Sequence, residues 1–356
     1  MYTRILLLDL KKKDTMPEPL QIHKALADET RLRLMRLLGR SPLNVNEILS
    51  ILQMGQSRIS RHLRILAEAD LVTRRREGTW IYYESHAESD WPMVRDTLSL
   101  LSDHERELPS YEQDMQRLEE AIEGRRQQTL SFFDSLTDQQ EAGERLSPDG
   151  HTYREVALSL LPQAPERVLD LGTGSGLLLP SLLDRADQVI AVDASTTMLQ
   201  LARQTAGKAA VDRCEFRLGD LEHLPVADGE VDAVVACMVL HHVPRPQAAI
   251  TEAWRALAPG GELTVVELAQ HEDESMRELH ADLWLGFRPI EMRRWLTQAG
   301  FEVTEGEPRT EDNQPTLPLI TFRGTKPCSK RPTRRQNQSG TAKTATTASG
   351  RKRTTK

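Results

Sequence analysis

Apolar residues recur at helical spacing through the first third of the chain and predict three helices in succession. The first covers residues 32–38 and ends at Gly39, a common helix stop. The second begins at Asn44, which forms the pattern of a capping box with Glu47. The third covers residues 56–66 after a short turn. Together these segments predict a small helical unit.

The third predicted helix has one apolar face and one basic face. Ile59, Leu63 and Leu66 share the apolar face, so hydroxyl and guanidinium groups lie on the opposite side. Such a helix suits the major groove of DNA. Residues 72–76 and 80–83 then predict a β-hairpin with an arginine-rich arm that can contact phosphates. The candidate DNA-contacting residues are Gln56, Ser57, Arg58, Ser60, Arg61, Arg64, Arg74, Arg75 and Arg76.

Residues 26–31 and 56–63 carry a resemblance to the winged helix-turn-helix domain of the ArsR family of repressors. The resemblance implies a domain over residues 20–105 that binds operator DNA. It also implies a homodimer formed with the help of a closing helix, expected from Pro92 onward. Many members of the family sense a metal through cysteines on the helix before the recognition helix. Residues 44–49 hold no cysteine, so we expect no metal sensing.

A different pattern begins near residue 168, where a short apolar run enters a glycine-rich turn from Gly172 to Gly176. A second apolar run, residues 188–193, ends on Asp193. Short apolar runs of this kind predict buried strands of a parallel sheet. A strand, a glycine turn and an acidic residue after the next strand indicate a nucleotide-type pocket at the carboxyl end of the sheet. Asp193 can accept hydrogen bonds from two ribose hydroxyls there.

The glycine spacing narrows the choice of cofactor. A dinucleotide fingerprint requires Gly-x-Gly-x-x-Gly, but here Gly176 falls one position early and Leu177 stands where glycine is needed. Asp170 is awkward beside a pyrophosphate and suits the amino group and sulfonium of S-adenosylmethionine. The pattern Asp-x-Gly-x-Gly-x-Gly resembles motif I of class I methyltransferases. The resemblance implies S-adenosylmethionine as cofactor and an α/β fold, a Rossmann-like seven-stranded methyltransferase domain preceded by a mainly helical winged helix-turn-helix domain.

Later segments fit the same family over residues 151–325. Residues 217–225 resemble its third strand and acidic turn, where the family's aspartate, here Asp220, meets the adenine amino group. Residues 231–242 resemble strand four, and residues 257–263 resemble the turn into strand five. The cofactor-contacting residues implied by the resemblance are Asp170, Gly172, Thr173, Gly174, Gly176, Asp193, Ala194, Met198, Gly219, Asp220, Leu221 and Met238.

Methyl transfer from a sulfonium is an in-line displacement, so the protein mainly aligns the nucleophile and excludes water. A general base helps only when the nucleophile arrives protonated. His241 is the best-placed candidate, ahead of His242 and His280. Residues 238–241 lack the Asn/Asp-Pro-Pro-Tyr/Phe sequence of amino-methylating DNA enzymes, and the Pro-Cys nucleophile of cytosine-C5 enzymes does not appear within residues 151–325. Base methylation is therefore disfavoured. We expect a small-molecule methyl acceptor and no metal ligands.

Residues 106–150 predict a helical linker between the two domains. Its segments Arg125-Arg126 and Phe132-Phe133-Asp134 resemble a segment that precedes the methyltransferase core in bacterial fusions of these two domains. The aromatic pair either covers the cofactor pocket or simply belongs to the core. Both interpretations remain open at the level of the sequence.

Composition and charge describe the two ends of the chain. Removing the ten Lys and Arg residues of 326–356, which hold no acid, from the net charge of −7 leaves −17 for the rest. We expect a basic disordered tail that adds phosphate contacts or only solubility. Residues 1–19 match neither domain, and Met16 is an alternative start. The three cysteines show no paired spacing, and no apolar run has the length of a membrane span, so a cytoplasmic location is expected.

The sequence thus predicts a DNA-binding transcriptional regulator fused to an S-adenosylmethionine-dependent methyltransferase that acts on a small molecule. A non-catalytic transcription factor that senses S-adenosylmethionine or S-adenosylhomocysteine is the alternative. A nucleic-acid methyltransferase is a less favoured third. The pattern of residues specifies neither the methyl acceptor nor the operator.

Overall fold

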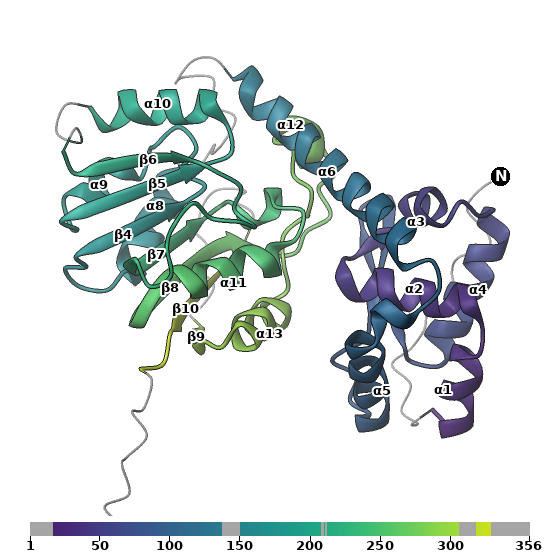
Figure 1. Ribbon diagram of the computed structural model, residues 1–356. Coiled ribbons are helices and arrows are strands. Elements are labelled where there is room, and N and C mark those ends of the chain that lie inside the picture. Colours follow the sequence, from purple (N-terminus) through teal and green to yellow (C-terminus); the bar gives the residue numbers. More distant parts are fainter. Residues whose placement is uncertain (1–16, 137–149, 208–209, 211, 306–317, 329–356) are drawn as a thin grey trace, which may run out of the picture.

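The computed structural model of the protein describes residues 17–136, 150–207, 210, 212–305 and 318–328. Most of the predicted N-terminal extension, the end of the linker and most of the basic tail therefore lie outside the described residues. No helix in the described ranges combines the length and the apolar character that crossing a membrane requires. The described part forms two units joined by the long helix α6, Tyr111–Ser135 (Figure 1).

The N-terminal unit is helical and carries a three-stranded sheet of order β1-β3-β2. The backbone N–H of Glu47 donates to the Asn44 side chain over 3.1 Å, and that of Asn44 donates to the Glu47 carboxylate over 2.8 Å, so the predicted capping box is confirmed. The elements are α1 (Pro19–Leu26), α2 (Glu29–Arg40), β1 (Leu43–Asn44), α3 (Val45–Leu52), α4 (Gln56–Glu68), β2 (Val72–Glu77), β3 (Trp80–Ser85), α5 (Pro92–Asp103) and a short 3-10 turn, Glu105–Glu107.

Helix α2 begins earlier than the apolar spacing predicted. Asp28 caps it, because its side chain accepts a hydrogen bond from the backbone N–H of Arg31. The closing helix expected from Pro92 is present as α5.

The C-terminal unit contains a seven-stranded sheet of order β6-β5-β4-β7-β8-β10-β9. Strands β6, β5, β4, β7 and β8 run parallel, and β10 lies antiparallel between β8 and β9. This order, with one antiparallel strand inserted near the edge, confirms the predicted α/β class. The elements are α8 (Gly150–Leu160), β4 (Arg167–Leu171), α9 (Leu179–Leu183), β5 (Gln188–Asp193), α10 (Thr196–Ala206), β6 (Cys214–Leu218), β7 (Val231–Cys237), η3 (Leu240–His242), α11 (Pro246–Ala256), β8 (Leu257–Leu268), α12 (Ser275–Leu279), α13 (Pro289–Ala299), β9 (Glu302–Glu305) and β10 (Leu319–Thr325).

Both faces of this sheet are covered, because successive strand residues point to opposite sides. Val168 of β4 packs with α8 and α9, whereas the next residue, Leu169, packs with α11 and α13. The same alternation separates Val234 from Val235 in β7. The sheet is therefore the middle of three layers, which leaves the carboxyl ends of its parallel strands as the edge where a site can form.

Helix α6 belongs to both units. Its first half contributes Leu118 and Ile122 to the core of the N-terminal unit. Its last turns place Phe132 and Phe133 against Met198 and Leu201 of α10. Figure 1 shows this single helix running from one unit to the other.

Candidate cofactor cavity and DNA-binding face

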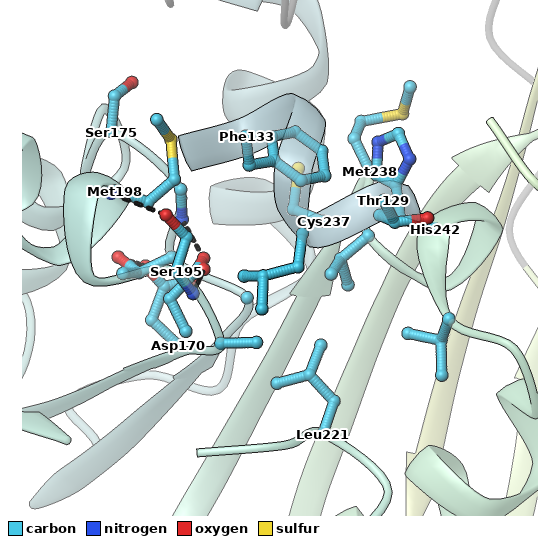
Figure 2. Close-up of a pocket in the computed structure, with 18 of the residues that line it drawn as sticks. Thr129, Phe133, Asp170, Ser175, Ser195, Met198, Leu221, Cys237, Met238 and His242 are labelled. Carbon is cyan, nitrogen blue, oxygen red and sulfur yellow. Dashed lines mark hydrogen bonds between the residues drawn. The ribbon is translucent and has the colours of Figure 1, made fainter. Parts of the chain in front are cut away.

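A cavity of about 200 Å³ lies at the carboxyl ends of the parallel strands. Its walls come from the turn after β4, from the ends of β5 and β7, from the loop after β6 and from α6. Figure 2 shows Asp170 and Ser195 on one side of it, with Met238 and His242 on the other. These five separate chain segments converge on one space, as the predicted pocket requires.

The glycine turn after β4 forms one wall without side chains. The backbone N–H groups of Gly172 and Thr173 both donate to the Val192 carbonyl over 2.9 Å, which ties the turn to β5. Gly172 has a φ of +70°, and a Cβ there would lie 2.2 Å from Val239 Cγ2. A side chain at this position would therefore clash with Val239, two residues after β7, and would also have to adopt a backbone conformation that favours glycine.

Asp193 ends β5 and faces this turn. Its carboxylate accepts hydrogen bonds from the backbone N–H groups of Gly174 (2.8 Å) and Ser195 (2.9 Å). Burial raises the pKa of Asp193 to about 6, although these N–H donors act in the opposite direction. Each carboxylate oxygen keeps further acceptor capacity, so Asp193 can still bind hydroxyl groups in the cavity.

Asp170, at the end of β4, is a second buried carboxyl on the cavity wall. The Thr173 hydroxyl donates to it over 2.7 Å. Burial raises its pKa to about 6 as well, and the charge of Asp193 adds to this. Within the described part of the chain, neither carboxylate has a lysine or arginine at ion-pair distance. Two such groups suit a ligand that carries positive charge and hydroxyls, which is the chemistry of S-adenosylmethionine.

All of the predicted cofactor-contacting residues line the cavity except Gly176 and Gly219. A Cβ on Gly176 would lie 2.7 Å from the Ala202 Cα, so this glycine allows α10 to pack closely against the turn. A Cβ on Gly219 would lie 2.5 Å from Pro225 Cδ. Both glycines are therefore explained by packing. Direct contact with a cofactor stays a prediction for the residues on the wall.

Helix α6 forms a further wall of the cavity, a role that the sequence had left undecided. Arg126, Thr129, Leu130 and Phe133 line the cavity. Arg126 lies 3.0 Å from the Asp220 carboxylate and 3.3 Å from that of Glu222. Phe133 is thus part of the cavity wall, whereas Phe132 is not among the lining residues, and both rings pack against α10. Tyr153 and Arg154 of α8 also line the cavity, and no local pattern indicated them.

The prediction that His241 is the catalytic base needs correction. His241 is buried behind the cavity, with its Nδ1 2.7 Å from Glu267 Oε2, and it is not among the described residues that line the space. Burial lowers the pKa of His241, but Glu267 and Asp282 outweigh this and raise it to about 9. The neighbouring His242 does line the cavity, with its ring edge-on to Phe133 at 4.9 Å. The two histidines alternate across η3, so position in the sequence could not distinguish them.

The predicted DNA-binding face of α4 has the expected polarity. Ile59, Leu63 and Leu66 are buried, which confirms the inward face. Ser60 is half-buried. The exposed residues of the opposite face are Gln56, Ser57, Arg58, Arg61 and Arg64. This face is free to meet a nucleic acid, although contact with DNA stays a prediction.

The hairpin β2–β3 was expected to expose its arginines to phosphates, but Arg75 is covered. The Arg75 side chain is only 9% exposed and lies 2.7 Å from Glu291 and 2.8 Å from Glu77. Its guanidinium also lies over the Trp284 ring at 5.2 Å. Arg75 therefore holds the hairpin against the C-terminal unit and is not available to phosphate in this structure. Arg76 is exposed and Arg74 is half-buried.

Comparisons with known proteins agree with this two-part organisation. Residues 28–74 match the bacterial regulatory protein, arsR family, and residues 169–265 match a methyltransferase domain. An arsenite methyltransferase from Halobacterium salinarum is 32% identical over 158 residues, which are 42% of this chain and 40% of the relative. An uncharacterized methyltransferase from Mycobacterium bovis is 40% identical over 143 residues, which are 40% of this chain and 54% of the relative. The chain thus spans about half or less of the length of these curated relatives.

Among solved structures, the N-methyltransferase NodS from Bradyrhizobium japonicum, determined with S-adenosyl-L-homocysteine, aligns with a TM-score of 0.45. It is 18% identical, and the alignment covers 56% of this chain and 99% of that chain. The methyltransferase match and the strand order found here indicate the S-adenosylmethionine-dependent fold, and the cavity residues fit that cofactor. The chain therefore carries an ArsR-family helix-turn-helix domain and an S-adenosylmethionine-dependent methyltransferase domain in one polypeptide.

Proposed function

We propose that the C-terminal domain transfers a methyl group from S-adenosylmethionine to a small molecule and that the N-terminal domain binds operator DNA. The observation that carries the first half is the convergence of Asp193, Asp170 and the side-chain-free turn on one cavity. Asp193 would hold the ribose hydroxyls, and Asp170 would lie toward the positive end of the cofactor. S-adenosylmethionine supplies the methyl group on a sulfonium.

The remaining walls of the cavity would exclude water and shape the space for the methyl acceptor. Phe133 and Leu130 from α6 cover the space opposite the strands and would exclude water from the displacement. Met238 lines the same space with a φ of +55°, a left-handed conformation that costs a non-glycine residue on the order of 1–3 kcal/mol. Strain of this kind persists where surrounding structure holds it, which supports a functional role for the end of β7.

Binding of S-adenosylhomocysteine, which cannot donate a methyl group, tests the cofactor assignment directly. Asp193→Asn keeps the shape of the side chain and removes its charge. We expect the Asp193→Asn variant to bind S-adenosylhomocysteine more weakly, with a loss of about 1–3 kcal/mol in binding free energy measured by calorimetry. The matched control is Asp187→Asn, an exposed aspartate before the same strand. Equal affinity of both variants and the unchanged protein would refute the assignment. Turnover is then measured as methyl release with a panel of small hydroxyl, amine and thiol compounds.

The sensor alternative has its own support in the structure. Adjacent residues of α6 hold the two domains: Arg125 binds Glu47 of α3 over 2.6 Å, and Arg126 binds Asp220 beside the cavity. A ligand that moves α6 would therefore change the position of α3. Calorimetry of S-adenosylhomocysteine with and without operator DNA tests this coupling, because any effect must be equal in both directions. Identical cofactor affinities in the two titrations would eliminate the sensor.

A homodimer through the N-terminal domain belongs to the same proposal. Helix α5 buries Val94 and Leu98 but leaves Leu100 59% exposed. An exposed leucine on the closing helix is consistent with a second copy of the chain covering it.

A further inference from the structure

Three side chains that could bind a metal ion gather beside the cofactor cavity. His241 and His242 come from η3, and Asp282 comes from the loop after α12. Asp282 Oδ1 lies 3.8 Å from His241 Nε2 and 3.8 Å from His242 Nδ1, and the three donor atoms all lie within 4.8 Å of one another. Imidazole nitrogens and one carboxylate form a donor set that suits Zn²⁺ and related ions.

Asp282 has no hydrogen-bond partner for either carboxylate oxygen among the described residues. Its side chain is fully buried, with a relative exposure of 0%. A buried carboxylate without hydrogen bonds is costly unless a positive charge or a metal lies next to it. The side chain that most needs a cation is therefore the one that is aimed at both imidazoles.

His241 is oriented as a metal ligand from its other side. Its Nδ1 contacts Glu267 Oε2 at 2.7 Å, which directs Nε2 toward Asp282. Glu267 is in turn fixed by the backbone N–H groups of Val239 (2.9 Å) and Leu240 (2.6 Å). Metal-binding histidines almost always donate their second ring N–H to a carboxylate or carbonyl in this way.

We propose that His241 Nε2, His242 Nδ1 and Asp282 bind one divalent transition-metal ion of the Zn²⁺ type. Donors at about 2.1 Å from a tetrahedral ion lie roughly 3.4 Å apart, a little closer than the 3.8 Å found here. The 3.4 Å contact between His242 Nδ1 and the Ala281 carbonyl is long for a hydrogen bond, so this nitrogen can turn to a metal.

The cluster lies between two cavities, which leaves room for a further ligand. His242 lines the cofactor cavity, and Asp282 lines a separate cavity of about 220 Å³ between the two domains. Three protein ligands leave a fourth position that water or a small molecule can fill. The site goes beyond the proposed methyl transfer and does not depend on it. It also departs from the expectation, drawn from the sequence, that the protein has no metal ligands.

The test uses the full chain, stripped of metal with a chelator and titrated with Co²⁺. We expect about one equivalent to bind with the visible absorption of a low-coordinate site and to be displaced by Zn²⁺. Asp282→Asn and His242→Gln should abolish this absorption, and Glu267→Gln should weaken Co²⁺ binding roughly ten- to hundredfold. The control is His104→Gln, which changes an exposed histidine beside Glu107 and should leave the titration unchanged.

Thermal unfolding supplies a second measurement. Zn²⁺ should raise the melting temperature of the unchanged protein and of His104→Gln, but not that of Asp282→Asn or His242→Gln. If Asp282→Asn does not fold, His242→Gln decides. The proposal is overturned if the unchanged protein binds no stoichiometric Co²⁺, or if the two cluster variants bind it as well as the control. Asp282 would then only balance a protonated His241. Affinity for S-adenosylhomocysteine, measured in parallel, tests the cofactor assignment separately.

Discussion

Helix α4 and the hairpin β2–β3 carry similar basic sequences, yet the structure treats their arginines differently. Arg61 and Arg64 of α4 are exposed, whereas Arg75 of β2 is buried between Glu77 and Glu291. The inward face of α4 is fixed locally by its own apolar spacing, so its outward face follows. Glu291, which comes from the other domain, lies 216 residues away from Arg75 in the sequence. A local pattern therefore predicts an exposed helix face better than it predicts which arginine a distant domain will cover.

The docked hairpin also limits how the chain can meet DNA. Glu77 is buried and accepts a hydrogen bond from the backbone N–H of Leu285 over 2.8 Å, and the Thr79 N–H at the hairpin turn donates to Glu274. In this arrangement α4 is the open part of the helix-turn-helix domain. We expect the exposed Arg76 to reach phosphate in this arrangement, and Arg75 to do so only if the hairpin leaves the methyltransferase domain.

The largest effect on this comparison is expected from Arg75→Ala. It leaves the buried carboxylates of Glu77 and Glu291 without their shared cation, and breaking a buried pair in this way costs about 3–5 kcal/mol. Chemical denaturation should show this loss, with faster hydrogen exchange in β2 and β3. The neighbouring Arg76→Ala is the control and should unfold like the unchanged protein. Equal stability of both variants would mean that the hairpin is not held by Arg75.

Arg61→Ala tests the exposed arginines of α4, the other region in this comparison. If Arg61 reads a base edge from α4, its loss should weaken operator binding by about 1–3 kcal/mol and relax specificity at one position. The operator is first identified by selection of bound DNA, and binding is measured on it and on a scrambled duplex. A similar loss on both duplexes, with a smaller salt slope, would assign Arg61 to phosphate instead.

Arg76→Ala should have a smaller effect of a different kind. An exposed hairpin arginine that contacts phosphate contributes to all DNA sequences alike. We expect a uniform loss of affinity and a salt slope reduced by about 1. Titrations at several salt concentrations measure both quantities. An unchanged slope would show that the docked hairpin does not reach DNA at all.

The smallest expected effect is a pH dependence of the docked state. Burial raises the pKa of Glu77 above its ordinary value, although Arg75 acts in the opposite direction. The folded protein then holds this proton more tightly than the unfolded chain. The resulting stabilisation is present below the ordinary pKa and is lost as the pH rises through the folded value. Glu77→Gln should remove this part of the profile, as measured by denaturation at a series of pH values. Superimposable profiles would contradict the assignment.

The fold and much of the cavity followed from the sequence because short-range chemistry specifies them. The strand that carries Asp170, the glycine turn and Asp193 are close in the chain, and the two residues of the capping box, Asn44 and Glu47, lie three positions apart. The role of Arg126 could not be predicted, because its partner Asp220 comes from the other domain. His242, and not the predicted His241, lies on the cavity wall. Which of two adjacent histidines faces the cavity depends on the backbone of η3, and the residue types alone do not specify this.

Helix α6 has a mechanical consequence for the whole molecule. From Leu118 in one core to Phe133 at the cavity, an α-helix rises about 22 Å at roughly 1.5 Å per residue. A helix resists compression along its axis, so we expect a displacement of Phe133 along that axis to be felt at Leu118. Leu118 and Ile122 would then shift against α3, and the angle of α4 would follow. One helix thus gives the cavity wall and the core around α3 a common support.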